Sequence, residues 1–338
     1  MEDQASNSSF SHTDFRLRGF PGISESRQFF AIPILVIDIL ILTGNCTMAY
    51  VIWTEKTLRS PMYILISMVF SLNVSYAMTV MPKFLLGMMF GLERITLAEC
   101  LTQMSFLYMA GTFSSNLFLL IAVDRYVAIV LPLRYHLIMT EKTLAVLLFL
   151  SLVRSFLFVS LIVGFTSRVQ FCGSNVILNF ACENMSLLNL GCGDVFGVQA
   201  VGLWVRILLT AMDGAFIVIS YLRILYTVMN LVEGKARDKA RQTCSAHLLV
   251  AVVTYSSGLS SSIIYRMGHL ISSDVQNTIS ILNYVIPAAA DPIIYGVKMR
   301  EIRNSLKKRL SLKKRQQFVF SVAVMFSLGK LDRKQPKH

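Results

Sequence analysis

Residues 117–135, LFLLIAVDRYVAIVLPLRY, place an adjacent acid and base, Asp124 and Arg125, inside a long apolar run. Isolated charges are costly in an apolar segment that crosses a bilayer, so they are seldom present for stability alone. The cost is smaller at the end of a membrane helix, where the two charges can pair and reach the polar interface. We therefore interpret the stretch as the end of a membrane-spanning helix that presents a charge pair.

The composition of the whole chain is that of a polytopic membrane protein. Of its 338 residues, 54% are hydrophobic and only 15% are charged, whereas soluble proteins carry about 25% charged residues. Apolar stretches of about 20 residues, long enough to cross ~30 Å of hydrocarbon, recur along the sequence. The net charge of +13 comes largely from loops between these stretches and from the tail. We therefore expect no nucleic-acid partner.

Seven apolar stretches predict an all-α bundle of seven transmembrane helices. They cover about residues 29–53, 62–88, 97–130, 144–165, 195–226, 244–265 and 275–297. Lys and Arg concentrate in the connections after the first, third and fifth spans and after the seventh, which marks these as cytoplasmic. We expect a multi-pass plasma-membrane protein with an extracellular segment (1–28), a seven-helix transmembrane domain (29–297) and a cytoplasmic basic tail (298–338). Residues 298–312 have the spacing of an amphipathic helix on membrane lipid.

Two features depend on this orientation. Asn7 begins an Asn-Ser-Ser tripeptide, which is a glycosylation acceptor if it is extracellular and otherwise a chance match. Cys100 begins the third span, and Cys172, Cys182 and Cys192 follow one another at spacings of ten residues between the fourth and fifth spans. Four cysteines in an oxidising compartment are consistent with two disulfide bridges, and their spacing leaves the pairing open.

The sequence shows no arrangement typical of catalysis. Its five histidines form no metal-ligand spacing such as HExxH, and there is neither a phosphate-binding glycine loop nor a nucleophile elbow. We therefore expect no enzyme, no resident metal and no cofactor. A transporter would be expected to show internal repeats or broken helices near the membrane midplane, and no convincing repeat is present.

An ordered set of short motifs accompanies the spans. They are Gly44-Asn45, Ser60-Pro61-Met62-Tyr63, Asp124-Arg125-Tyr126-Val127-Ala128-Ile129, Ser220-Tyr221, Lys239-Ala240 with Thr243-Cys244 and His247, and Asp291-Pro292-Ile293-Ile294-Tyr295. With them the chain resembles a rhodopsin-like G-protein-coupled receptor. Phe15-x-Leu17-x-Gly19-Phe20-Pro21-Gly22, Asp213 and Tyr265-Arg266-Met267-Gly268-His269 make it similar to the class I (fish-like) group of odorant receptors.

The resemblance carries implications and also has departures. It implies the disulfides Cys100–Cys182 and Cys172–Cys192. The family's acids in the second and third spans correspond here to Asn73 and Ser114, so we expect a weakened cation site unless Asp291 takes over its role.

The resemblance also implies a small-molecule pocket between the outer halves of the third, fifth and sixth spans. The residues that it implies in this pocket are Tyr108, Gly111, Thr112, Met185, Ser262 and Arg266. Leu107 stands where aminergic receptors place an aspartate, so an ammonium ligand would lack its counter-ion. Arg266 favours a carboxylic acid, because a guanidinium can bind a carboxylate through two parallel hydrogen bonds. The alternative is that Arg266 extends to the lipid headgroups.

Further charges lie inside the predicted spans. Arg206 could be a second anchor for an anion, but we favour packing or extension to the headgroups. Asp213 lies seven residues later, about 10 Å along the same helix face, and a structural role is expected for it. Asp38 and Arg154 are expected to face the bundle, with partners that the sequence does not assign.

The resemblance implies a two-state receptor whose active state is favoured by an odorant. Tyr255 stands at the usual aromatic switch, and the other expected switch residues are Asp124, Arg125, Tyr126, Tyr221, Asp291 and Tyr295. The implied partner is the stimulatory olfactory G protein, which raises cyclic AMP. A receptor of the same fold that senses metabolites outside the nose is the alternative.

Overall fold

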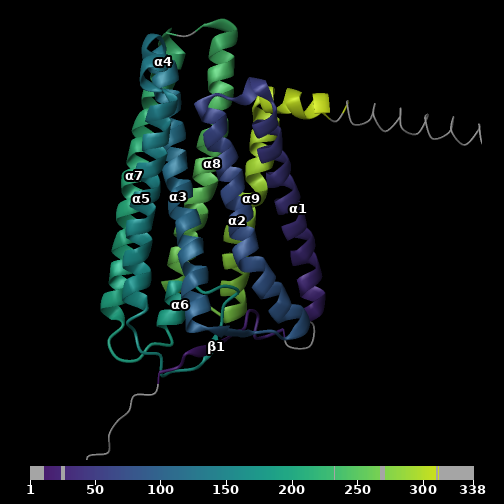
Figure 1. The fold of residues 1–338 in the computed structure, drawn as a ribbon, viewed down its shortest axis with the longest axis vertical. Helices are drawn as coiled ribbons and strands as arrows, with labels where there is room; N and C mark the ends of the chain where they lie inside the picture. Colours follow the sequence, from purple (N-terminus) through teal and green to yellow (C-terminus); the bar gives the residue numbers. More distant parts are fainter. Residues whose placement is uncertain (1–10, 24–26, 232, 267–270, 310, 312–338) are drawn as a thin grey trace, which may run out of the picture.

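A computed structural model describes residues 11–23, 27–231, 233–266, 271–309 and 311, without the side chains of residues 261, 262, 265 and 266. Within these residues, seven long helices lie side by side in one bundle (Figure 1). They are α1 (Arg27–Thr54), α2 (Pro61–Phe90), α3 (Leu97–Val130), α5 (Glu141–Thr166), α7 (Phe196–Leu231), α8 (Gly234–Arg266) and α9 (Ser273–Lys298). The predicted seven-helix fold is confirmed.

Six of these helices are long and apolar enough to cross a membrane, as judged over the described residues. The exception is α8, which begins at Gly234. Its first turns therefore contain the basic residues that we expected in the loop before the sixth span, namely Lys235, Arg237, Lys239 and Arg241. That expectation was wrong, because Lys, Arg, Gln and Ala in residues 235–242 are strong helix formers and continue the helix beyond the apolar span.

Local signals fix where several helices begin and end. Thr96 and Glu99 form a capping box that starts α3, and the side chains of Thr140 and Ser272 cap the first turns of α5 and α9. Gly91 closes α2 with a φ of 72°, a left-handed conformation that suits a residue without a β-carbon. Short one-turn segments η1 (Lys56–Leu58), η2 (Pro132–Arg134) and α4 (Tyr135–Ile138) occupy two connections.

A three-stranded sheet covers one end of the bundle, which we call the sheet end. Its middle strand is β1 (Asp14–Leu17), which pairs antiparallel with β2 (Arg94–Thr96) and parallel with β3 (Val176–Ile177). Phe15 and Leu17 alternate with polar residues and are buried, so residues 14–17 are built into the fold. Arg27 at the start of α1 forms an ion pair with Glu93 and donates to the Gly19 carbonyl oxygen.

One disulfide ties the loop between α5 and α7 to α3, and a second closes this loop on itself. Cys100 on α3 is bonded to Cys182, and Cys172 is bonded to Cys192, with Cα–Cα distances of 5.3 and 5.7 Å. This is the pairing that the resemblance implies. The loop also contains α6 (Asn184–Leu188), which packs against α5, α7 and α8.

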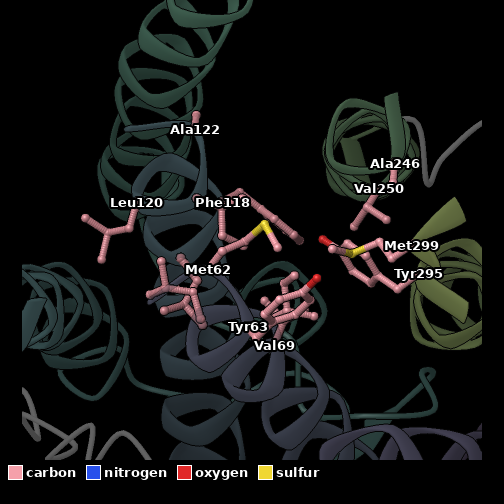
Figure 2. Close-up of a cluster of buried hydrophobic side chains, with 14 of the residues drawn as sticks. Met62, Tyr63, Val69, Phe118, Leu120, Ala122, Ala246, Val250, Tyr295 and Met299 are labelled. Atoms are coloured by element: carbon pink, nitrogen blue, oxygen red, sulfur yellow. The ribbon is translucent and has the colours of Figure 1, made fainter. Parts of the chain in front are cut away.

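The largest hydrophobic cluster lies at the opposite end and contains residues of α1, α2, α3, α5, α7, α8 and α9; Figure 2 shows part of it. Tyr295 is fully buried there and meets the ring of Phe70 edge-on at 5.7 Å. After α9 the chain turns and residues 300–309 form a further helix that leaves the bundle axis (Figure 1). This helix buries Ile302 and places the Arg309 guanidinium over the ring of Tyr50.

Candidate functional site

A cavity of about 260 Å³ lies between α3, α5, α7 and α8, near the sheet end, and α6 closes one side of it. Its wall includes Tyr108, Gly111, Thr112, Met185 and Arg206, so the structure brings five of the predicted pocket residues together. The backbone of Ser262 and Arg266 belongs to α8, and their side chains lie outside the described residues. Asn7 also lies outside them.

Glu183 is a cavity residue that the sequence analysis missed. Its Oε2 accepts a hydrogen bond of 2.9 Å from the Tyr108 hydroxyl, which itself accepts one of 3.1 Å from Asn184 N. Burial raises the pKa of the Glu183 carboxyl, while the charge of Arg206 and the hydrogen bond from Tyr108 act in the opposite direction. An acid directly after Cys182 was the available signal, because a disulfide to the third span must hold the next residue near the pocket.

The loop that carries Glu183 is fixed on both sides. The Cys100–Cys182 disulfide joins it to α3, and Gln103 accepts a hydrogen bond of 2.9 Å from Cys182 N. On the other side, Asn184 Nδ2 donates to Thr166 Oγ1 at the end of α5, at 2.8 Å. Glu183 is therefore held over the cavity by contacts that do not involve its own side chain.

Arg206 on α7 directs its guanidinium into the bundle. Its Nη2 lies 3.6 Å from the point where a β-carbon on Gly258 of α8 would stand. Gly258 therefore leaves room for the arginine. In the described part of the chain, no carboxylate oxygen lies within 4.0 Å of Arg206, the limit for an ion pair. Of the two roles that we favoured, packing agrees better with the close approach to Gly258 than extension to the headgroups, and Arg206 also lines the cavity.

A polar network forms the floor of the cavity. Arg154 Nη2 on α5 lies 2.8 Å from Asp213 Oδ1 on α7, and Arg154 also donates to Asn116 of α3. Ser115 donates to Asp213 Oδ2 at 2.7 Å and shares a hydrogen bond of 2.7 Å with the hydroxyl of Tyr255 on α8. The network supplies the partners that the sequence did not assign to Arg154. It joins four helices, and its two charges neutralise each other.

At the opposite end of α3, Asp124 is completely buried and forms an ion pair with Arg125. Its other oxygen accepts a hydrogen bond of 2.9 Å from the hydroxyl of Tyr135 in α4. Burial, together with the charge of Asp124, raises the pKa of Tyr135 to about 12, so the hydroxyl keeps its proton at neutral pH. Tyr221 and Tyr295 belong to the hydrophobic cluster beside this pair, and Tyr126 packs against that cluster.

A smaller network occupies the middle of the bundle, where the resemblance suggests a weakened cation site. Asn73 Nδ2 donates to Asn45 Oδ1 at 3.0 Å and to Asp291 Oδ2 at 2.9 Å. Asp291 Oδ1 has no hydrogen-bond partner among the described residues. Over the same residues, no group of three or more His, Cys, Asp or Glu side chains could hold a metal ion.

Comparisons with known proteins extend over the whole bundle. The model of a family described as "Olfactory receptor" matches residues 34–313. Olfactory receptor 51E2 of Mus musculus is 32% identical over 298 residues, which cover 88% of this chain and 93% of that protein. Olfactory receptor 52N2 of Homo sapiens is 33% identical over 298 residues, covering 88% and 92%. Olfactory receptor 52B6 of Homo sapiens is 34% identical over 296 residues, covering 87% and 88%.

Proposed function

This chain belongs to the olfactory receptor family, and from that premise we propose that its cavity binds small volatile or carboxylic-acid-type ligands through the Arg206 guanidinium. Members of the family are G-protein-coupled receptors and not enzymes, and the chain is a multi-pass membrane protein. Relatives numbered 51 and 52 agree with the class I resemblance.

The observation that carries the ligand assignment is the position of Arg206. A guanidinium in a mostly apolar cavity offers a planar set of donors to a carboxylate or carbonyl oxygen. Since no carboxylate of the described residues is in ion-pair contact with Arg206, its donors are available to a ligand. Arg266, whose side chain is not described, remains a predicted second anchor.

The proposed orientation places the sheet end outside the cell and the Asp124–Arg125 end in the cytoplasm. The alternation of basic connections supports it, since Lys and Arg concentrate on the cytoplasmic side of membrane proteins. The two disulfides at the sheet end support it as well, because disulfides persist in an oxidising compartment. The receptor would then present its cavity to the outside at the plasma membrane.

The proposed mechanism is a shift between two states. A ligand in the cavity contacts the floor, where Ser115 links Asp213 to Tyr255 on α8. A ligand that favours a different arrangement of this floor changes the position of α8, and the cytoplasmic end opens. Arg125, Tyr221 and Tyr295 would then engage a stimulatory olfactory-type G protein and raise cyclic AMP.

A cyclic AMP reporter in transfected cells tests this function. Short carboxylic acids are compared with aldehydes and ketones of the same chain length on the wild type, Arg206→Gln and Arg266→Gln. Arg168→Gln is the matched control, because Arg168 is exposed at the same end and does not line the cavity. We expect Arg206→Gln to raise the half-effective concentration of active ligands by about tenfold or more. An unchanged curve at equal surface expression would refute the role of Arg206.

A further inference from the structure

Two opposite charges face the same cavity without forming an ion pair. Glu183 lies in the loop after Cys182 and Arg206 lies on α7, and both line the cavity wall. The charge of Arg206 acts on the Glu183 carboxyl, yet the two groups are more than the 4.0 Å of a salt bridge apart. Because both residues line the cavity, a ligand inside it could reach both charged groups.

The remaining charges of the cavity compensate one another. Arg154 and Asp213 form their ion pair at the floor, with Asn116 and Ser115 completing their hydrogen bonds. Among the described side chains of the wall, Glu183 and Arg206 are the other charged pair, one negative and one positive. A carboxylate added to this cavity would leave an excess negative charge in a poorly solvated place, which is unfavourable.

We propose that Glu183 and Arg206 together recognise a small neutral molecule with a hydroxyl donor next to a carbonyl acceptor, that is, a hydroxyketone or a related hydroxycarbonyl compound. The hydroxyl donates to the Glu183 carboxylate, and the carbonyl oxygen accepts from the Arg206 guanidinium. The inference rests on the proposed function and narrows its ligand class.

The existing contacts leave the Glu183 carboxylate free to accept, and the Arg206 guanidinium free to donate, a hydrogen bond to a ligand. Tyr108 uses one oxygen of Glu183, Oε2, at 2.9 Å, and a carboxylate has further acceptor sites on its other oxygen. Tyr108 also holds Glu183 in place, because its own hydroxyl accepts from Asn184 N. On the other side, Gly258 gives the Arg206 guanidinium space beside α8. A bridging ligand therefore completes hydrogen bonds without breaking the ones already formed.

Such a site should discriminate strongly between close analogues. A ligand that lacks the hydroxyl leaves the Glu183 carboxylate facing apolar atoms. A ligand that lacks the carbonyl leaves the Arg206 guanidinium without an acceptor. Buried charged groups that lose their partner cost more than a neutral hydrogen bond, so each omission should weaken binding by about tenfold or more. A ligand with both groups should be preferred over an acid.

A set of four-carbon compounds of similar size tests the proposal. The set consists of 3-hydroxy-2-butanone, 2-butanone, 2-butanol and butanoic acid, and a second set with six carbons repeats the comparison. Dose-response curves are measured by cyclic AMP in cells that express the wild type, Glu183→Gln, Arg206→Gln or Asp194→Asn. Asp194 is the control, because this exposed acid lies in the same loop and does not line the cavity. Surface expression is matched throughout.

The wild type and Asp194→Asn should respond to the hydroxyketone at concentrations about tenfold or more below those of the ketone, the alcohol and the acid. Glu183→Gln should lose this preference and gain sensitivity to the acid, because Arg206 is then an uncompensated cation. A merely structural role for Glu183 would weaken all four ligands alike, and that result would overturn the proposal.

The outcomes separate the two proposals. If butanoic acid is the most potent ligand and Arg206→Gln abolishes its effect, the hydroxycarbonyl inference fails while the proposed function of Arg206 stands. If Arg206→Gln leaves every response unchanged, both fail. Silence of the surface-expressed wild type toward both sets also counts against both.

Discussion

The Nζ atom of Lys239 on α8 lies 2.5 Å from Oε1 of Glu301 in the helix of residues 300–309. Burial raises the pKa of Glu301, but the hydrogen bond and the charge of Lys239 outweigh it, so the pKa of this carboxyl lies below its ordinary value. The pair joins the N-terminal part of α8 to the helix of residues 300–309. It therefore opposes the displacement of α8 that activation requires in the proposed mechanism.

We expect Glu301→Gln to raise ligand-free cyclic AMP modestly. Both side chains are partly exposed, at 66% and 33%, so the pair contributes at most about 1 kcal/mol, a roughly fivefold shift between the two states. Lys307→Gln, an exposed residue of the same helix, is the control. The exchanged pair Lys239→Glu with Glu301→Lys should restore the low basal signal; failure of this rescue would argue against the ion pair as a restraint.

Neutralising Asp124 should have a larger effect. A hydrogen bond to a charged group contributes about 1.5–3 kcal/mol, so loss of the Asp124–Arg125 pair should shift the equilibrium toward the active state by roughly tenfold or more. Asp124→Asn is compared with Tyr135→Phe, which removes only the hydrogen bond to the other carboxylate oxygen. The readout is ligand-free cyclic AMP at matched surface expression. A silent Asp124→Asn receptor would assign the pair a structural role.

The Arg154–Asp213 pair should be required for stability. Removing one partner leaves a buried charge unpaired, at a cost of about 3–5 kcal/mol. Asp213→Asn should therefore lower the melting temperature of the detergent-solubilised receptor and its surface level. The double variant Arg154→Met with Asp213→Leu, which removes both charges, should recover much of the loss. Equal loss in the single and double variants would contradict the cost of an unpaired charge.

The hydroxycarbonyl preference should depend on pH. Because burial raises the pKa of Glu183, this carboxyl takes up a proton at a higher pH than a glutamate free in solution. The titratable and charged groups around it are Arg206, Tyr108 and Tyr76. Lowering the external pH toward the raised pKa of Glu183 should then reduce the potency of 3-hydroxy-2-butanone. Glu183→Gln should not show this pH dependence, and an identical pH response in both proteins would exclude Glu183 as its origin.

The sequence predicted the bundle well and the contacts within it poorly. For most of the seven helices, the predicted ends lie within a few residues of the observed ends. The length of an apolar run is a local property of the sequence, so it can be predicted directly. Glu183 and Tyr108, in contrast, are 75 positions apart, and Arg154 and Asp213 are 59 apart. Their meeting depends on the rotation of each helix about its axis. A helix with lipid on one side and packed neighbours on the other is apolar all round, so its pattern does not encode that rotation.

The sheet was missed for a different reason. Each strand has only two to four residues, and no strand of that length has a recognisable pattern of its own. Phe15 and Leu17 were noted as part of a family motif, but their burial became apparent only from their pairing with Ile95 and Ile177.

The place of β1 between its two neighbours has a consequence for biosynthesis. The ribosome makes β1 before any helix, yet the parallel partner of β1 is made only after α5 has been completed. β1 can pair with β2 once residues 94–96 have been made, but its other edge must stay unpaired until Val176 and Ile177 have emerged. The sheet is therefore completed only after α5 has been made, and a nascent chain halted before Val176 would lack β3 together with α7, α8 and α9, and so would have no cavity.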